Sequence, residues 1–459
     1  MKRILSISLA VLVSAAAMAQ TPRTAYHTDG FAYGHELNPA LQPDTNYMSL
    51  PVLGNTSVTM NSTMKMSSLL FDMPGNADKL TLFTTNGTIS KSDLLKKVGS
   101  GMNTGFDARL TLISIGQRLS PARYRTYEAA FRIQGSAYVP KALFSMLKDV
   151  ENGTYNINGM TLNATSFLDL SYGESYRLDD RWTVGGKVKL LVGILNANAK
   201  VDNLNVSIDA DQNWSAQGNV TANVSGLEYK TTTKEYTHRT NADGTPATYN
   251  MVDGVKVGGL GLNGLGLAID AGAEYRLDRN WTFSAAIRDL GFITWFKSRK
   301  AENSGSKFEF EGFQNVSKEG DNTLKNQWNV LKDDLMDMIH VEEKGTGAYT
   351  KMLSATAEAS ARYKQDIYTA GFLYTASIQG KCSWMEARLN LGVTPYDGLD
   401  VVISPNYGTF GFGVGAMVSY RHNGYSYYLG SDRLYWQVNK QLIPTSLNAA
   451  LQFGMTLPL

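Results

Sequence analysis

Residues 181–196 read RWTVGGKVKLLVGILN, and their side chains alternate between two kinds with a period of two. One face carries only apolar side chains and one glycine, namely Trp182, Val184, Gly186, Val188, Leu190, Val192 and Ile194. The opposite face includes the polar side chains of Arg181, Thr183, Lys187 and Lys189. Because successive side chains point to opposite faces of a β-strand, this stretch predicts a strand that is apolar on one face only.

The same alternation recurs at 127–139, 410–420 and 447–459. These segments exceed the usual strand of about 5–6 residues. Their length fits a tilted strand that crosses a membrane in about 9–11 residues, apolar toward lipid and polar toward the lumen. A strand of a soluble sandwich also alternates, so the alternation alone leaves both architectures open.

The first residues predict export. A basic pair, Lys2 and Arg3, precedes an apolar run at 4–13, and an A-x-A cleavage site follows at 17–19. This pattern is typical of a secretory signal peptide over residues 1–19. The alternative, a membrane anchor, needs a longer run, and no uninterrupted stretch of about 18 apolar residues occurs elsewhere. Export and strand length together favour a β-barrel in the cell outer membrane.

We therefore predict an all-β fold, a transmembrane antiparallel β-barrel of about fourteen strands with long outer loops. The expected strands are 47–60, 105–118, 127–139, 166–177, 182–195, 265–276, 281–296, 352–363, 367–377, 385–393, 399–405, 409–421, 425–437 and 446–458. The expected long connections are 61–104, 140–165, 196–264 and 297–351, whereas 119–126, 178–181, 277–280 and 364–366 are short. Short periplasmic turns and long outer loops are typical of outer-membrane barrels.

An internal repeat marks two of the short turns. YRLDDRWT at 176–183 recurs as YRLDRNWT at 275–282, and tyrosines also flank the turn at 364–366. Tyrosine and tryptophan side chains prefer the headgroup level of a membrane. We expect an aromatic girdle near the periplasmic turns that contains Tyr176, Trp182, Tyr275, Trp281, Tyr363 and Tyr368. An ordinary repeated hairpin turn is the alternative.

Composition excludes several classes of protein. The 459 residues are 18% charged, with 43 basic and 41 acidic side chains, and loss of residues 1–19 would leave 41 of each. This balance argues against a nucleic-acid-binding protein, which normally has a basic surplus. The single cysteine, Cys382, excludes an intramolecular disulfide framework and a CxxC metal site. We expect it beside an outer loop as a reduced thiol.

Motifs that could indicate chemistry lack the context it needs. Residues 259–264 read GLGLNG, but a strand follows where a dinucleotide site needs a helix. The five histidines, His27, His35, His238, His340 and His422, show no metal-ligand spacing, and we expect them on the surface or in the lumen. We predict no catalytic residue, metal or cofactor. An outer-membrane enzyme remains the third and least supported hypothesis.

The last long connection contains an amphipathic helix and an acidic run. Leu324, Trp328, Leu331, Leu335 and Met338 form one apolar stripe at helical spacing. We expect this helix to cap the barrel mouth or to pack under a loop; a partner-binding helix is the alternative. The acidic residues at 333–343 could bind calcium, but a solvated helix face is the simpler interpretation.

Four short stretches resemble known families. Residues 29–41 read DGFAYGHELNPAL, and the Asn38-Pro39-Ala40 element resembles the N-terminal region of FadL-type and PorV-type barrels. The stretches 48–55, 287–295 and 428–432 resemble a family of Bacteroidota outer-membrane barrels of unknown function. The resemblance implies that residues 20–46 form a hatch in the lumen, with Asn38, Pro39 and Ala40 within it. Residues 47–459 would form the barrel.

Two functions follow as hypotheses. The first is passive uptake of a small hydrophobic or amphipathic molecule, implied by the FadL-type resemblance and by a lumen too wide for side chains to fill. The second is a surface or secretion-associated scaffold that binds a protein partner through its outer loops, implied by the PorV-type resemblance. Outer-membrane lipid is the expected partner in both cases, and nucleic acid in neither.

Overall fold

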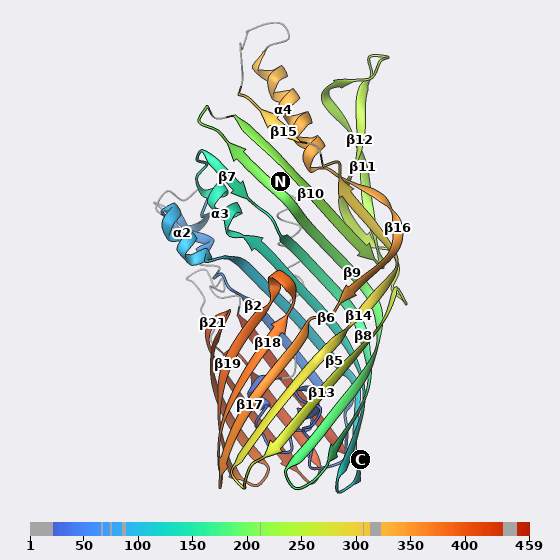
Figure 1. Ribbon diagram of the computed structural model, residues 1–459, viewed down its shortest axis with the longest axis vertical. Coiled ribbons are helices and arrows are strands. Elements are labelled where there is room, and N and C mark those ends of the chain that lie inside the picture. Colours follow the sequence, from blue (N-terminus) through green and yellow to red (C-terminus); the bar gives the residue numbers. More distant parts are fainter. Residues whose placement is uncertain are drawn as a thin grey trace.

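A computed structural model describes residues 22–65, 68–73, 76–84, 89–211, 213–305, 307–312, 323–434 and 448–459. In this part of the chain, fourteen antiparallel strands close into a transmembrane β-barrel. Figure 1 shows the barrel as the lower part of the molecule, with a second region of strands and helices rising above one side of it. The predicted architecture and strand number are confirmed. The expected signal peptide lies outside the described residues.

The barrel strands follow one another around the wall in chain order. They are β2 (Asn55–Ser62), β5 (Gly101–Ser120), β6 (Arg123–Pro140), β8 (Met160–Arg177), β9 (Trp182–Ile208), β13 (Gly264–Arg276), β14 (Trp281–Asn303), β17 (Ala355–Gln365), β18 (Tyr368–Ile378), β19 (Trp384–Tyr396), β20 (Leu399–Gly408), β21 (Gly411–His422), β22 (Tyr425–Ser431) and β23 (Ala449–Pro458). Strand β2 pairs with β5 on one side and with β23 on the other, which closes the barrel.

The first wall strand differs from the prediction because it is interrupted. The short strand β1 (Tyr47–Met48) pairs with the same two neighbours as β2, and residues 49–54 between them form a turn. Pro51 has no backbone N–H for a strand ladder, and Val52 has a φ of 68°, outside the β region. Strand β22 ends at Ser431, and residues 435–437 of the predicted strand 425–437 lie outside the described residues.

The outer face of the barrel is apolar, as the alternation predicts. In β9, Val188 and Leu190 are 57% and 40% exposed, whereas the intervening Lys189 is 7% exposed and points into the lumen. The other exposed apolar side chains on the wall include Ile113, Leu170, Leu267, Ile269, Leu290, Phe292, Phe372, Leu389, Leu391, Ile403, Val418, Leu429 and Leu451. A continuous outward apolar band is the surface that a barrel presents to lipid.

The two repeated turns have the same hydrogen bonds. Asp179 Oδ1 accepts from the backbone N–H groups of Arg181 and Trp182, at 2.8 and 2.7 Å. In the second copy, the side chain of Asp278 accepts from the corresponding two groups, both at 2.8 Å. An aspartate that bonds to the backbone two residues ahead stabilises a tight turn, so the repeated sequence encodes repeated geometry.

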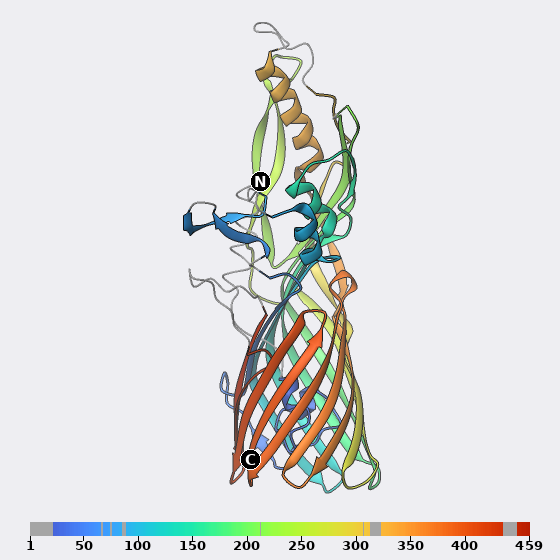
Figure 2. The same cartoon turned by 90° about the vertical axis from the view of Figure 1, so that its left-hand side faces the viewer.

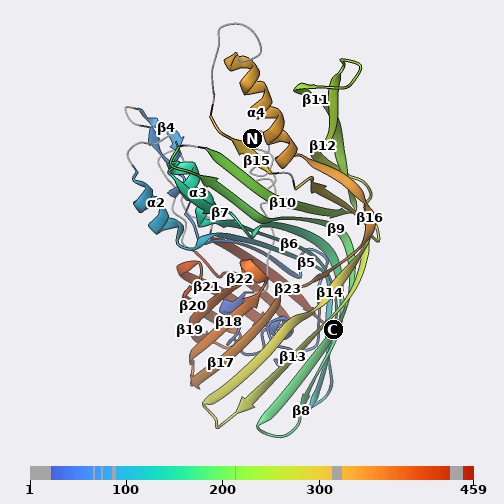
Figure 3. The same cartoon turned by 45° about the horizontal axis from the view of Figure 1, so that its top comes forward.

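The predicted long connections are folded rather than irregular. Several wall strands continue beyond the barrel: β9 has 27 residues and β14 has 23, well beyond the predicted ends at 195 and 296. Together with the inserted elements they form the projection seen in Figures 2 and 3. Its elements are β3 (Leu70–Met73), β4 (Asn76–Leu82), α2 (Lys91–Val98), α3 (Lys141–Lys148), β7 (Gly153–Asn156), β10 (Trp214–Ser225), β11 (Leu227–Thr240), β12 (Pro246–Val257), β15 (Phe308–Phe310), α4 (Leu324–Ile339) and β16 (Val341–Met352). The last residues of β16, Lys351 and Met352, pair with β14 in the barrel wall.

The projection has its own apolar core. Tyr155, Val206, Ile208, Ala216, Phe308 and Met338 are buried in one cluster, to which the helix contributes Met338 and, partly buried, Leu331. The predicted helix is confirmed, but it packs on the sheet of the projection rather than over the barrel mouth. No helix among the described residues is long and apolar enough to span a membrane.

The acidic run is only partly solvated, and among the described residues it forms no group that could hold a metal ion. Asp333 is 3% exposed and accepts hydrogen bonds from the backbone N–H groups of Thr237 and His238, at 2.7 and 2.6 Å. Asp334 and Asp337 are partly exposed, and both pair with Arg239. Residues of α4 therefore hold β11 in place. The expectation of a solvated helix face fails at Asp333, because the partner strand was not visible in the sequence pattern.

Candidate functional site: the lumen and the segment inside it

Residues 22–46, which we call the luminal segment, lie inside the barrel. Asn38 is fully buried, and its side-chain oxygen accepts a hydrogen bond from the backbone N–H of Ala40 at 2.9 Å. Its amide also donates to the Tyr26 hydroxyl at 3.1 Å. Two glycines of the wall make room for this turn, since a Cβ at Gly272 would lie 2.0 Å from Asn38 Oδ1 and one at Gly185 only 2.1 Å from Pro39 O. The turn is thus fitted directly against the inner wall.

Aromatic side chains pack the luminal segment against the barrel. The ring of Phe31 lies 5.0 Å from that of Tyr428, and the ring of Tyr33 lies 5.9 Å from that of Tyr47. All four rings are at most 5% exposed and belong to one apolar cluster. Edge-on aromatic contacts of this kind stabilise a packed interior beyond the burial of their area.

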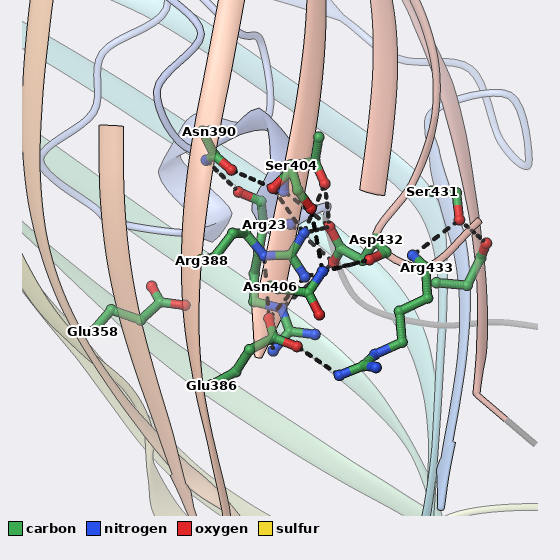
Figure 4. A network of polar contacts seen from close by, with 12 residues as sticks. Arg23, Glu358, Glu386, Arg388, Asn390, Ser404, Asn406, Ser431, Asp432 and Arg433 are labelled. Carbon is green, nitrogen blue, oxygen red and sulfur yellow. Dashed lines mark hydrogen bonds and ion pairs between the residues drawn. The ribbon is translucent and has the colours of Figure 1, made fainter. Parts of the chain in front are cut away.

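The beginning of the luminal segment is bound by buried charges, which we call the Asp432 anchor (Figure 4). The carboxylate of Asp432 accepts from the backbone N–H of Arg23 at 3.1 Å and from the backbone N–H and hydroxyl of Thr24 at 2.9 and 2.7 Å. Arg388, from β19, lies 3.3 Å from Asp432 and 2.7 Å from Glu386. Arg433 approaches the second oxygen of Glu386 at 3.0 Å.

A second group of buried charges, the central charge cluster, lies beside the luminal segment on the inner face of the adjacent strands β6, β8, β9, β13 and β14. Lys189 lies 2.7 Å from both Asp270 and Asp289, and Arg132 lies 2.9 Å from Asp289 and 3.2 Å from Asp169. Asp289 has a φ of 56°, at a register shift between β13 and β14. Such a bulge re-aims a side chain, and here the carboxylate is inside the barrel, 9% exposed.

The luminal segment joins this cluster through a carboxylate of its own. Glu36 lies 3.0 Å from the Arg109 guanidinium, which also pairs with Glu128. The backbone carbonyl of Glu36 accepts from Arg288 at 3.0 Å, and Arg288 pairs with Glu358 at 2.8 Å. Removing one member of a buried pair leaves the other charge uncompensated, so these contacts strongly favour a single position of the segment.

A third, more exposed contact lies at the short-turn end. Asp29 pairs with Arg362 and Lys364, and its side chain is 40% exposed. Burial alone would raise the pKa of Asp29, but the two cations outweigh burial and hold the pKa below its ordinary value of 3.8. The carboxylate is therefore ionised at neutral pH.

Histidines of the luminal segment take structural positions in the lumen. His35 is 3% exposed; Lys187 Nζ lies 3.2 Å from its Nδ1, and the Tyr47 hydroxyl lies 2.6 Å from its Nε2. A lysine ammonium group only donates, so Nδ1 is the acceptor and Nε2 carries the proton. His27, also buried, lies 3.0 Å from the amide nitrogen of Asn390. Among the described residues, no group of three histidine, cysteine or acidic side chains is arranged to hold a metal ion.

Two small cavities lie above the luminal segment. The larger, about 50 Å³, is lined by Arg23, Asn103 and Cys382 among others. The smaller, about 20 Å³, is lined by Asn163, Trp295 and Lys351 among others, and the two share Gln134, Gly135, Ser354 and Gln379. Cys382 is a free, buried thiol in the turn η4 (Gly380–Cys382), between β18 and β19.

A third cavity lies on the opposite side of the wall. This outer trough, about 580 Å³, crosses β5, β6, β8, β9 and β13 on the outer face, and Leu170, Val188, Leu190, Leu267 and Ile269 contribute apolar side chains to it. On the inner face, an apolar cluster of Phe167, Leu191, Ala268, Ile293 and Trp295 spans three of the same strands. The two apolar surfaces lie on opposite faces of β8, β9 and β13, and a single layer of strands separates them.

The predicted aromatic positions gather at the short-turn end on the outer face. Tyr176, Trp182, Trp281 and Tyr368 are 39%, 43%, 40% and 65% exposed. The rings of Trp182 and Tyr275 lie 4.7 Å apart across two strands, and those of Trp281 and Tyr363 lie 5.1 Å apart. The GLGLNG motif precedes and enters β13, with no helix after it, so it lacks the helix N-terminus of a dinucleotide site.

Sequence reasoning missed the charges that bind the luminal segment. Asp432, directly after β22, and Arg388 of β19 are distant in sequence, as are Asp289 and Arg132 of the central charge cluster, and only the closed barrel brings the members of each pair together. Charged residues at inward positions of predicted strands, such as Lys189, were the available signal. Sequence alternation shows which face they occupy but not which partner they meet.

Several solved structures share the barrel fold at low similarity. The toluene transporter TbuX of Ralstonia pickettii has a TM-score of 0.42 and 9% identity, over 96% of this chain and 99% of that chain. A FadL homologue of Pseudomonas aeruginosa has a TM-score of 0.38 and 11% identity, over 96% of both chains. The translocator domain of the autotransporter NalP from Neisseria meningitidis has a TM-score of 0.34 and 8% identity, over 91% and 90%.

Among curated proteins, none matches the chain in sequence. A family model does match, and it extends from Pro39 in the luminal segment to Asp432 in the anchor that binds its beginning. With residues 39–432 matched, the chain belongs to DUF5723, a family of unknown function.

Proposed function

We propose that the protein resides in the cell outer membrane and admits a small hydrophobic or amphipathic molecule passively. In this orientation the short turns face the periplasm and the projection faces outward. The exposed aromatic residues at the short-turn end, with Trp182 and Trp281 among them, then form a girdle at the inner headgroup level, in contact with outer-membrane lipid.

One observation carries the uptake proposal: apolar surfaces lie back to back on the two faces of one wall. Ile293 and Trp295 of the inner cluster line the smaller cavity above the luminal segment, and the outer trough around Leu267 faces lipid. Transfer of the apolar part of a molecule from water to the inner surface, or to the lipid outside, is favourable. A single layer of strands separates the two surfaces.

The luminal segment acts as a hatch in this proposal. It fills the lumen below the cavities, and its buried ion pairs oppose displacement. The lumen therefore offers polar solutes no continuous water-filled path. An apolar molecule can instead bind to the apolar surfaces of the wall. The Asn38-Pro39-Ala40 turn, fitted against Gly185 and Gly272, holds the hatch to the side of the barrel that bears the trough.

The test is uptake by intact cells, because their lipopolysaccharide leaflet slows hydrophobic solutes. Cells that carry the wild-type barrel, or a variant lacking residues 20–46, are compared with cells that carry neither. The readouts are the uptake of a hydrophobic fluorescent dye and of a polar solute that outer membranes exclude. We expect the wild type to admit the dye alone and the deletion to admit both solutes.

Dye uptake that is no faster in cells with the wild-type barrel than in cells without it would contradict the proposal, as would a deletion of residues 20–46 that leaves the permeability to the dye and to the polar solute unchanged. Correct insertion is verified separately by the altered migration of the folded barrel on unheated gels. A variant of the projection, Asp334→Asn, is the matched control, since it changes a charged residue far from the lumen and should leave uptake unchanged.

The projection favours a second candidate function, a scaffold for a protein partner. It has a separate apolar core, and helix α4 presents Val330 and Ile339 at 37% and 41% exposure. A photo-crosslinking residue at position 330 on intact cells should then capture one protein in stoichiometric amount. The same residue at position 255 of β12 is the control, and equal, diffuse labelling at both positions would count against a scaffold.

A further inference from the structure

The lining of the smaller luminal cavity has an unusual balance of charged residues. Its described lining includes one cation, Lys351, and no aspartate or glutamate. Elsewhere in the lumen a buried lysine is matched: Lys189 lies 2.7 Å from each of two carboxylates. The environment of Lys351 therefore differs from that of a lysine of the same barrel whose role is structural.

Among the described residues, Lys351 makes only neutral contacts. Its Nζ donates to Asn163 Oδ1 at 3.0 Å and to Thr165 Oγ1 at 3.5 Å. An ammonium group has three N–H donors, so the two neutral acceptors leave one donor and the whole charge uncompensated. Burying a charge without an opposite charge is costly, which favours a site that receives an anion.

A second donor lies beside it. Trp295 is fully buried, and its indole Nε1 has no hydrogen-bond partner. Trp295 pairs with Tyr349 and Ile293 pairs with Lys351, so Trp295 and Lys351 are diagonal neighbours on the inner face of β14 and β16. The six-membered edge of the indole meets the wall, since a Cβ at Gly193 would lie 2.6 Å from Trp295 Cζ3. The side chains of Trp295 and Lys351 both line the smaller cavity.

We propose that this cavity binds a monovalent anionic group between the ammonium of Lys351 and the indole N–H of Trp295. The space of about 20 Å³ accepts an atom of water size, such as a halide or one carboxylate oxygen. The adjoining cavity of about 50 Å³ can take the next atoms of a larger molecule. The anion site itself does not depend on the proposed function. The identity of the transported molecule, an amphipathic molecule with a carboxylate group, rests on the proposed function.

The test uses the indole N–H signal of Trp295 in ¹⁵N-labelled barrel held in neutral detergent. Comparison with Trp295→Phe assigns the signal. Acetate probes a free small anion, octanoate a carboxylate on an apolar chain, and octanol the chain without the charge. We expect acetate and octanoate to shift the Trp295 signal saturably and octanol to leave it in place.

Two lysine variants give the matched comparison. Lys351→Met keeps the length of the side chain without its charge and should weaken anion binding about tenfold or more. Lys381→Met removes an exposed lysine at the adjacent turn and should leave binding unchanged. Tighter binding of octanoate than of acetate would identify the amphipathic molecule as the source of the anion, and equal binding would identify a small free anion.

No shift of the Trp295 signal with either anion in the wild type would overturn the inference, whatever the variants do. An equal shift in Lys351→Met would also overturn it, because the anion would then bind elsewhere. Failure of the uptake assay together with a saturable shift would instead contradict the proposed function and leave the anion site standing.

Discussion

The lumen and the projection both rely on charged side chains, but they bury them to very different extents. In the Asp432 anchor, Arg23 and Asp432 are 4% and 2% exposed, whereas Arg239 and Asp334 of the projection are 41% and 39% exposed. An exposed pair contributes about 0–1 kcal/mol, because water and salt screen it. A buried pair whose partner is removed costs about 3–5 kcal/mol. Similar residues thus fix the luminal segment firmly and the projection weakly.

The largest expected effect comes from changing one aspartate in each region to asparagine. Asp432→Asn leaves Arg23 and Arg388 without their shared carboxylate, and we expect a loss of about 3–5 kcal/mol in the free energy of unfolding. Asp334→Asn should cost less than about 1 kcal/mol. Urea titration of the folded barrels in detergent, followed by gel migration, measures both losses. Equal losses would show that burial does not distinguish the two regions.

A smaller effect is expected when an exposed valine is replaced by arginine, and its size depends on whether the valine faces lipid or water. Val188 on the barrel wall and Val255 in the projection are 57% and 48% exposed. We expect Val188→Arg to cost about 2–4 kcal/mol near the membrane midplane, because its charge enters hydrocarbon. Val255→Arg, in water, should be nearly silent. The comparison is made by urea unfolding in lipid vesicles, and similar tolerance at both positions would contradict the assigned membrane-facing surface.

The smallest effect concerns Asp29, which resembles the exposed pairs of the projection although it belongs to the luminal segment. Its pKa is held below 3.8 in the folded protein, so the contact stabilises the fold above the unfolded pKa and this contribution is lost as pH falls through the folded value. Asp29→Asn should lower stability by at most about 1 kcal/mol at neutral pH, since the group is partly exposed. The difference between variant and wild type should vanish in acid. A difference in stability that persists in acid would show that ionisation of Asp29 is not its cause.

Alternation in the sequence was enough to predict the barrel, because the period of two is a local property of each strand. The inward position of Lys187 and Lys189 was predicted in this way. The sequence pattern also suggests that Arg at Lys187 or Lys189 would be nearly silent, as expected for a water-filled lumen. At Lys189 the structure does not support that reason, because the ammonium group lies 2.7 Å from each of two carboxylates rather than in open water. We therefore expect arginine at position 189 to disturb both ion pairs.

Other features could not be predicted because they depend on distant strands. The Asp432 anchor joins residues more than 400 positions apart, as in the bond from Arg23 to Asp432. The projection arises where β9 and β14 continue past the barrel, and alternation weakens there because both faces meet protein or water. Helix α4 was predicted from its apolar stripe, but its place on the projection depends on Asp333 and Asp337 meeting β11.

The most direct test is hydrogen–deuterium exchange of the folded barrel, read by mass spectrometry for two segments. We expect slow exchange for residues 22–46, comparable to the barrel strands, because opening the luminal segment breaks several buried ion pairs. We expect faster exchange for the hairpin β11–β12, whose side chains are mostly exposed. Exchange of residues 22–46 as fast as that of the hairpin would contradict the claim that buried charges hold the luminal segment in the barrel.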